Sequence, residues 1–208
     1  MNNYKRVIFY IDGFNFYYGL KTKGWRKYYW LDCVSFFEKF LKLYKQLIEL
    51  NYFSAKPKGS DKSQRQETFF SCNKVNSKFQ LHLGKFLKKN VTCNSCGNVH
   101  LTFEEKETDV NIAIIMIGDV VYDKCDISIL VSADSDLIPP INFIKKEFNP
   151  LHKIFVYFPP NRFSFDLRNK AFGIVKLENH ENKFSSSLLP ETVTLLNGVV
   201  LSKPSTWV

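Results

Sequence analysis

Residues 127–136, ISILVSADSD, join a short apolar run to a turn that is rich in acids and hydroxyls. A continuous apolar run such as 127–131 is typical of a strand that is buried on both faces of a parallel sheet. A similar run at 7–11, VIFYI, is followed directly by Asp12 and Gly13. We therefore expect two buried strands that each lead into a carboxylate.

The rest of the chain alternates strand and helix patterns. A third apolar run at 154–158 predicts another buried strand, while 109–122 and 139–148 have the apolar content of helices. This alternation favours an α/β fold with a central, mainly parallel sheet that is flanked by helices. Apolar residues at helical spacing predict a further helix over 34–50. Residues 90–103 have no regular pattern and are expected to form an irregular loop.

Length and composition indicate a domain with its own core. The chain has 208 residues, of which 45% are hydrophobic. We place one domain at 1–178 and a more polar C-terminal extension at 179–208. No apolar run is long enough to span a bilayer, and the first residues lack the long apolar stretch of a signal peptide. We expect a cytoplasmic protein with no membrane partner.

The charge balance favours a polyanionic partner. The formal net charge is +9, and each phosphate that a basic surface contacts releases counterions. Residues 21–30, KTKGWRKYYW, interleave four cations with four aromatic rings. Such rings stack on unpaired bases while cations hold phosphates, although the same aromatics could instead plug into the core. The candidate RNA contacts are Lys21, Lys23, Arg26 and Lys27, with Arg162 and Arg168 beyond the third strand.

Three aspartates follow two of the predicted strands: Asp12, Asp134 and Asp136. In an open parallel sheet, ligands bind beyond the carboxyl ends of the strands, so these side chains lie close together if the strands are adjacent. Carboxylates at close range repel one another, and Mg²⁺ or Mn²⁺ relieves the repulsion because these ions prefer oxygen ligands. Each acid also has a simpler interpretation, since Asp is common in turns after strands.

Two more polar residues belong to the same hypothesis. Asp109 begins the predicted helix at 109–122, where a carboxylate could also do no more than stabilise the helix dipole. Asn15 lies three residues after Asp12 and offers an amide to a metal-bound water or to a phosphate.

Three segments resemble the motifs of NYN domains. Residues 11–15, IDGFN, look like the opening motif, and 105–113, EKETDVNIA, resemble the motif EK-x-x-DV-x-x-A. Residues 130–137, LVSADSDL, resemble LVSGDSDF, with Ala133 in place of Gly and Leu137 in place of Phe. The three occur in the family's order, and the resemblance extends over most of residues 6–177. Ala133 constrains the turn slightly but removes no candidate ligand.

The resemblance implies a PIN-like, three-layer fold and a Mg²⁺- or Mn²⁺-dependent ribonuclease that acts on RNA, which we expect to be single-stranded. It carries over Asp12, Asp109, Asp134 and Asp136 as the acidic set that binds metal, with Asn15 and Ser132 as helpers. No Ser–His–Asp set is apparent in the sequence, so a covalent mechanism is not expected. Water activated by one or two metal ions is the mechanism that remains.

Two other functions are compatible with the same fold. A non-catalytic RNA-binding or regulatory module would keep the basic surface, but the complete acidic set favours an enzyme. A DNA-directed flap-type nuclease would need a substrate arch, and no segment has the pattern of a helical arch. The sequence leaves the RNA substrate, the pathway and a homo-oligomeric state open.

The cysteines suggest a second metal site. Five cysteines are an odd number, which argues against a disulfide framework. Cys93 and Cys96 have zinc-knuckle spacing, and the glycine that follows them permits a tight turn. We expect a structural Zn²⁺ site in an insertion at 79–103, completed by His82 and by either His100 or Cys72. The alternative is a pair of loop thiols without metal.

Overall fold

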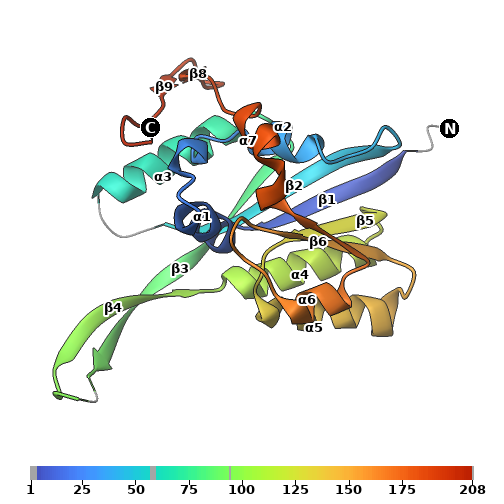
Figure 1. Cartoon of the computed structure of the whole chain (residues 1–208), viewed down its shortest axis with the longest axis horizontal. Coiled ribbons are helices and arrows are strands. Elements are labelled where there is room, and N and C mark those ends of the chain that lie inside the picture. Colours follow the sequence, from blue (N-terminus) through green and yellow to red (C-terminus); the bar gives the residue numbers. More distant parts are fainter. Residues whose placement is uncertain (1–3, 57–59, 94, 208) are drawn as a thin grey trace.

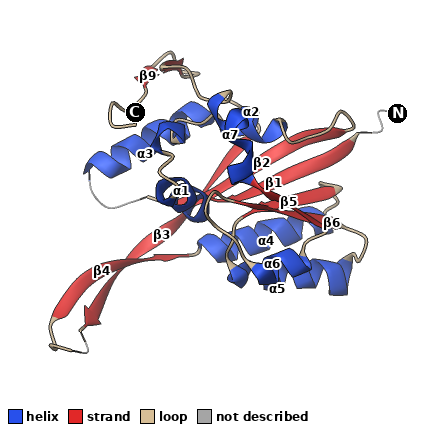
Figure 2. Ribbon diagram, in the orientation of Figure 1, coloured by secondary structure: helices blue, strands red, loops and turns tan. Residues whose placement is uncertain are grey.

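The computed structural model describes residues 4–56, 60–93 and 95–207, which form an α/β fold around a seven-stranded sheet (Figures 1 and 2). The strands are β1 (Lys5–Asp12), β2 (Lys45–Ala55), β3 (Phe79–Thr92), β4 (Val99–Lys106), β5 (Ile127–Val131), β6 (Lys153–Phe158) and β7 (Gly173–Lys176). Their order is β4-β3-β2-β1-β5-β6-β7, and every pair is parallel except β3 with β4. The prediction of a mainly parallel sheet is confirmed.

Helices cover both faces of the sheet and make three layers (Figure 2). One side carries α1 (Gly13–Thr22), α2 (Cys33–Glu38), α3 (Ser60–Asn73) and α7 (Glu181–Ser185), and the other carries α4 (Thr108–Val121), α5 (Ile138–Phe143) and α6 (Phe165–Lys170). Short 3-10 turns lie at Arg26–Tyr28, Ser135–Leu137 and Leu177–His180, and a π-helical turn lies at Ile144–Phe148. Strand β1 shows the two-residue period, because Phe9 packs into one core and Tyr10 into the other.

The predicted helix over 34–50 is wrong. Helix α2 ends at Glu38, and residues from Lys45 onward belong to β2, which pairs along its length with β1. Leu47 and Leu50 are buried while Ile48, between them, is 40% exposed. Over so few residues the apolar spacing suits a strand as well as a helix, and pairing with β1 decides between them.

Residues 90–103 form a β-hairpin and not the expected irregular loop. Strands β3 and β4 pair from Lys85↔Lys106 to Thr92↔Val99, and the hairpin extends away from the body of the molecule (Figure 1). Its apolar side chains are largely exposed, with Leu87 at 53% and Leu101 at 58%. The sequence shows no strand pattern here because the hairpin buries neither face, so no alternation of apolar and polar residues is required.

The last segment packs against the domain. Phe184 of α7 is fully buried in the core that contains α1, and Trp30 donates its indole N–H to the carbonyl of Pro190 at 2.8 Å. A two-stranded sheet, β8 (Thr192–Thr194) and β9 (Val200–Ser202), follows, and the Trp207 ring then contacts Tyr29 and Phe69. In the described residues no helix has the length and apolarity to cross a membrane.

Candidate active site

Asp12 is fixed by three hydrogen-bond donors at the carboxyl end of β1. One carboxylate oxygen accepts from the backbone N–H of Asn15 at 2.9 Å, as the N-cap of α1. The other accepts from the Asn15 side-chain amide at 2.7 Å and from the Ser132 hydroxyl at 2.8 Å. The side chain is only 2% exposed. Burial raises the pKa of Asp12, and the hydrogen bonds from Asn15 and Ser132 partly oppose that rise.

Ser132 ties the ends of two neighbouring strands together. Strand β5 pairs in parallel with β1, and Ser132 follows it directly. Its hydroxyl donates to Asp12 and accepts from the backbone N–H of Asp134 at 3.0 Å. Asp134 in turn caps the next 3-10 turn by accepting from the backbone N–H of Asp136 at 2.9 Å. The carboxyl ends of β1 and β5, which the sequence predicts to be followed by acidic residues, are therefore adjacent.

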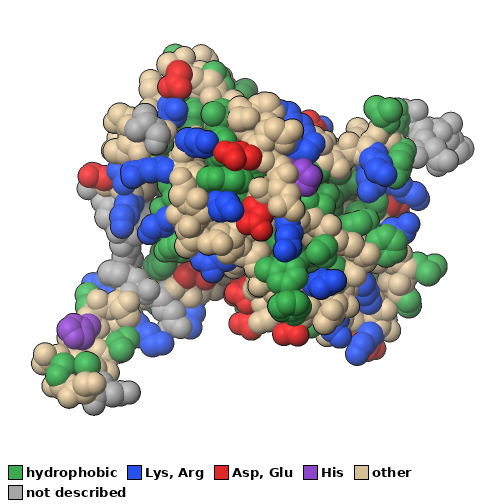
Figure 3. Space-filling view, viewed as in Figure 1, with side chains coloured by type: hydrophobic (Ala, Val, Ile, Leu, Met, Phe, Trp, Pro, Cys, Tyr) green, Lys and Arg blue, Asp and Glu red, His purple; other side chains and the backbone are tan. Residues whose placement is uncertain are grey.

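Asp109 lies near these acids and comes from another element, the first turn of α4. Its pKa is raised to about 6, first by burial and then by the charges of Asp12, Asp134, Glu105 and Asp136. The aspartates predicted from sequence are thus close enough to influence one another, and we call Asp12, Asp109, Asp134 and Asp136 the acidic edge. Acidic side chains gather near the base of the hairpin in Figure 3.

Gly13 is required for the close approach of α1 to β2. A Cβ atom on this residue would lie 2.5 Å from the carbonyl oxygen of Phe53 and 2.5 Å from the ring of Tyr52. Since real Cβ atoms essentially never come so close to another heavy atom, any side chain here would push the start of α1, and with it Asp12, away from the sheet. The glycine after Asp12 is therefore a packing requirement of the site.

Glu105 is the first residue of the segment 105–113 and was not among the residues predicted to form the site. Its carboxylate accepts from the backbone N–H of Thr108 at 3.1 Å and also from the Thr108 hydroxyl. Glu105 thereby caps the start of α4, which carries Asp109, and its charge adds to those that raise the pKa of Asp109. The signal in the sequence was its position three residues before the first residue of a helix.

The donor chemistry of the acidic edge suits Mg²⁺ or Mn²⁺, but the side chains do not form a closed ligand set. No three His, Cys, Asp or Glu side chains in the described part of the chain are grouped so that they could hold one ion. Mg²⁺ is commonly bound through one or two carboxylates together with water and substrate phosphates, and does not require an all-protein cage. An open group of carboxylates, whose charges raise the pKa of Asp109, fits that mode of binding.

The structure does not bring together the four expected zinc ligands. Cys93 and Cys96 lie in the turn of the hairpin, where N–H groups of Ser95 and Cys96 lower the pKa of the Cys93 thiol. His82 instead accompanies the sheet, at 2.6 Å from the Asn51 side chain and with its ring stacked on a phenylalanine. Eleven residues of extended strand span roughly 36 Å, which separates His82 from Cys93.

The two other candidate zinc ligands also lie apart from the pair. Cys72 lies in α3 and is buried within the hydrophobic core that also contains residues of α1. His100 is on β4 of the hairpin, opposite Val91, and is exposed. Of the expected zinc ligands, only Cys93 and Cys96 therefore lie together in the turn of the hairpin.

The side chains of the basic and aromatic segment, residues 21–30, lie in different surroundings. Tyr28 and Trp30 are buried in the core, at 4% and 1% exposure. Lys23 pairs with Glu178 at 3.5 Å and Lys27 with Glu181 at 3.0 Å. Lys21 and Arg26 instead line a cavity beside α1. Arg162 and Arg168 are exposed, Arg162 just beyond the carboxyl end of β6 and Arg168 in the last turn of α6.

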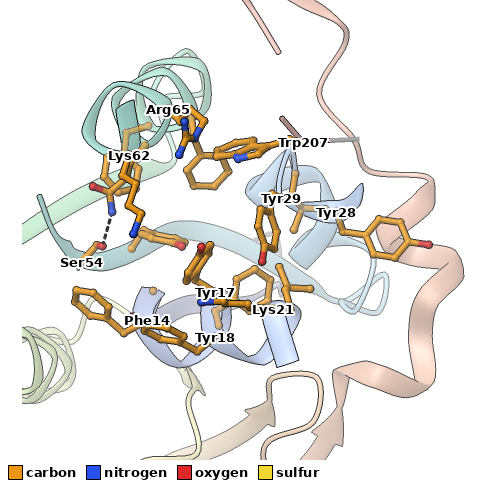
Figure 4. A pocket seen from close by; sticks show the side chains of 18 of the residues that line it. Phe14, Tyr17, Tyr18, Lys21, Tyr28, Tyr29, Ser54, Lys62, Arg65 and Trp207 are labelled. Atoms are coloured by element: carbon orange, nitrogen blue, oxygen red, sulfur yellow. Dashed lines mark hydrogen bonds between the residues drawn. The ribbon is translucent and has the colours of Figure 1, made fainter. Parts of the chain in front are cut away.

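That cavity, of about 710 Å³, is bounded by α1, the end of β2 and α3 (Figure 4). We call it the aromatic pocket. Its wall begins at Gly13, the residue after Asp12, so it adjoins the acidic edge on the α1 side of the sheet. The sequence marked part of its lining, Lys21 and Arg26, but not the residues that α3 and the C-terminal segment contribute.

The strand order and the acidic edge define the PIN-like class of α/β proteins. The family model of the NYN domain matches residues 6–178, and the chain belongs to that family, whose members are generally nucleases. Among solved structures, a protein of unknown function, VPA0982, from Vibrio parahaemolyticus RIMD 2210633 is similar in fold, with a TM-score of 0.60 and 18% identity. The match covers 91% of this chain and 99% of that one. No curated protein matches the chain.

Proposed function

We propose that the chain is a metal-dependent ribonuclease that hydrolyses RNA phosphodiester bonds at the acidic edge. The observation that carries this proposal is the gathering of four aspartates from β1, α4 and the turn after β5, with the pKa of Asp109 raised to about 6. Perturbed acids that cluster at the carboxyl edge of a parallel sheet are the pattern of a functional site. Capping accounts for Asp12 and Asp134 singly, but it does not account for four aspartates at one edge.

Each residue of the site has a task in this proposal. Asp12, Asp109 and Asp134 would hold Mg²⁺ or Mn²⁺, which when bound activates water and neutralises charge on the phosphate. Asn15 and Ser132 keep the Asp12 carboxylate in one orientation through three hydrogen bonds, so its position is set before any ligand arrives. Asp136 is exposed and faces water at the mouth of the site.

RNA is the substrate that the surface favours. The net charge of +9 coexists with an acidic edge, so the excess of cations lies elsewhere on the surface, where it holds phosphates. Figure 3 shows Lys and Arg side chains spread over the α1 and α3 side of the molecule. Aromatic rings beside those cations suit unpaired bases, which favours single-stranded RNA over a duplex.

A binding-only role is the alternative function. The observation that favours it is the lack of a closed metal-ligand set among the residues that the structure describes. Such a protein would bind RNA through the same basic surface and leave it intact, with or without divalent ions.

The two functions are separated by cleavage of a labelled single-stranded RNA in Mn²⁺, in Mg²⁺ and in chelator. We expect Asp12→Asn to slow cleavage by about 100-fold or more, because a ligand of the metal is lost. RNA affinity in chelator should change less than about two-fold, since phosphate contacts lie outside the edge.

A matched control is Asp123→Asn. Asp123 is 86% exposed in its side chain, pairs with Arg6 and precedes β5, at the opposite end of the sheet from the site. Its backbone φ of +51° also suits asparagine. Cleavage by the control at the wild-type rate, together with loss in Asp12→Asn, supports the ribonuclease. Cleavage by Asp12→Asn at the wild-type rate contradicts it, and no cleavage by any of the three proteins favours the binding-only role.

A further inference from the structure

The aromatic pocket is a built cavity whose lining the hydrolytic site does not use. Its volume of about 710 Å³ lies in the range of about 300–1,000 Å³ that is usual for small-molecule sites. In Figure 4, Tyr17 points into it from α1, Lys62 and Arg65 project from α3, and Trp207 lies beside α3. The lining therefore combines three parts of the chain that are far apart in sequence.

Aromatic rings line the pocket from α1 and remain accessible. Tyr17 and Tyr18 are 40% and 44% exposed, although large aromatic side chains are usually buried. Tyr17 holds its ring centroid 5.0 Å from that of Tyr29 and 5.3 Å from that of Tyr18. Phe14 meets Phe86 edge-to-face at 5.9 Å on the hairpin side. The rings contact one another, and those of Tyr17 and Tyr18 stay partly exposed, as in a stacking platform for bases.

Four cations that line the pocket have no acidic partner in the part of the chain that the structure describes. No carboxylate among the described residues forms an ion pair with Lys21, Arg26, Lys62 or Arg65, all of which line the cavity. In contrast, the neighbouring Lys23 and Lys27 are both paired with glutamates. Cations left unpaired around accessible rings complement a ligand that carries both planar rings and negative charge.

Polar groups close the far wall. The Gln66 side-chain amide of α3 donates to the Ser54 hydroxyl at 3.1 Å and to the carbonyl of Ala55 at 3.3 Å. Ser54 and Gln66 both line the cavity, so polar groups as well as cations border the space that a base would occupy. A purely apolar peptide or lipid chain would leave them without use.

We propose that the aromatic pocket binds one unpaired nucleobase of a single-stranded RNA, adjacent to the phosphate that the acidic edge cleaves. The adjacency follows from Gly13, which lines the pocket and directly follows Asp12. This inference rests on the proposed ribonuclease for its substrate, but the pocket's binding of a base does not require cleavage. Paired bases cannot enter, so the pocket selects single-stranded RNA.

The test measures binding in chelator, by fluorescence anisotropy, to three labelled probes of equal length. The first is a single-stranded oligoribonucleotide, the second the same strand in a duplex, and the third a strand whose nucleotides lack bases. We expect Tyr18→Ala to weaken binding of the first probe by about 10-fold, because one base loses its stacking partner. Binding of the duplex and of the baseless strand should change by less than about two-fold.

Two further variants separate stacking from loss of structure. Tyr18→Phe keeps the ring and should bind the single strand as the wild type does. Tyr44→Ala is the matched control, because Tyr44 is also exposed, at 53%, and also lies under a lysine, but it precedes the amino end of β2. For comparison, Lys21 lies 5.6 Å from the Tyr18 ring centroid and Lys45 lies 5.9 Å from that of Tyr44.

The outcomes distinguish this inference from the proposed function. Equal loss by Tyr18→Ala on the single strand and on the baseless strand would overturn the base pocket, because backbone charge alone would then explain binding. Wild-type binding by Tyr18→Ala would overturn it as well, even if Mn²⁺-dependent cleavage is observed. Loss confined to the single strand supports the pocket whether or not the protein cleaves RNA.

Discussion

The acidic edge and the hairpin turn are both marked in the sequence as metal sites, yet they are built in different ways. The carboxylates of the edge come from β1, α4 and the turn after β5, and Asp12 alone receives three hydrogen bonds while buried. Cys93 and Cys96 come from one turn, and Cys96 is exposed. The edge is therefore a product of the folded core, whereas the hairpin turn is a local feature that the core neither supports nor completes.

The largest expected effect follows from the dependence of the edge on close packing. Gly13→Ala places a Cβ 2.5 Å from the carbonyl oxygen of Phe53, so α1 must shift. We expect a loss of about 3 kcal/mol in the free energy of unfolding. The melting temperature, followed by circular dichroism, should fall by roughly 6–12 °C.

Gly97→Ala in the hairpin turn provides the comparison. Gly97 has a φ of +71°, so alanine is strained there, but no atom lies within 4 Å of the added Cβ. The cost of about 1 kcal/mol is local to a turn that is exposed and carries no core. A global melting temperature that falls as far for Gly97→Ala as for Gly13→Ala would show that the hairpin and the edge are not independent.

A smaller effect is expected from Asp109 and depends on pH. Its folded-state pKa of about 6 lies above the ordinary 3.8, so the folded state favours the protonated acid. The associated stability is present below about pH 4 and is lost as the pH rises through 6. Asn cannot ionise, so in chelator Asp109→Asn should become more stable than the wild type above pH 6, and not below pH 4.

The size of that gain is limited by solvent. The rise in the pKa of Asp109 from 3.8 to about 6 would correspond to roughly 3 kcal/mol, but Asp109 is only partly buried, and screening by solvent reduces the figure to about 1 kcal/mol. Denaturant unfolding at pH 4 and pH 8 measures the difference. A gain that is the same at both values would show that mutual repulsion at the acidic edge is not its cause.

The smallest effect is expected at the hairpin turn. The described residues supply two of the four ligands of a structural zinc site, so Cys93→Ser combined with Cys96→Ser should lower the melting temperature by less than about 2 °C. Metal analysis of the wild type and the double variant, both purified without added zinc, accompanies the melts. A zinc-loaded wild type and a fall of more than about 5 °C in the variant would show a structural metal, with ligands from elsewhere.

Features of the fold and the site were predicted correctly where a short stretch of sequence determines them. The apolar runs before Asp12 and Asp134 located two strands because a strand that is buried on both faces needs a continuous run, and their parallel pairing then placed the acids at one edge. The segment after Glu38 was mistaken for helix because its few apolar residues suit both periods. His82 was counted as a ligand by its distance in sequence, which an extended strand turns into a long distance in space.

The aromatic pocket had only a partial signal in the sequence, the basic and aromatic segment 21–30, which supplies Lys21, Arg26 and Tyr29 to its lining. Tyr17 and Lys21 lie in α1, Arg65 lies in α3, and Trp207 is the next-to-last residue of the chain. Apart from Lys21, none of these residues gives a functional signal by itself, since surface helices commonly carry tyrosine and arginine. Their meeting depends on how the C-terminal segment returns across α3, which no motif of the sequence specifies.

The packing of Trp207 gives the protein an optical reporter of its own. The chain has three tryptophans, of which Trp30 is 1% exposed and has its ring centroid 6.1 Å from that of Trp207. Trp207 instead lines the cavity and contacts the rings of Tyr29 and Phe69. Occupancy of the cavity therefore alters the surroundings of one indole, and the filling of this chamber can be followed by intrinsic fluorescence without a dye.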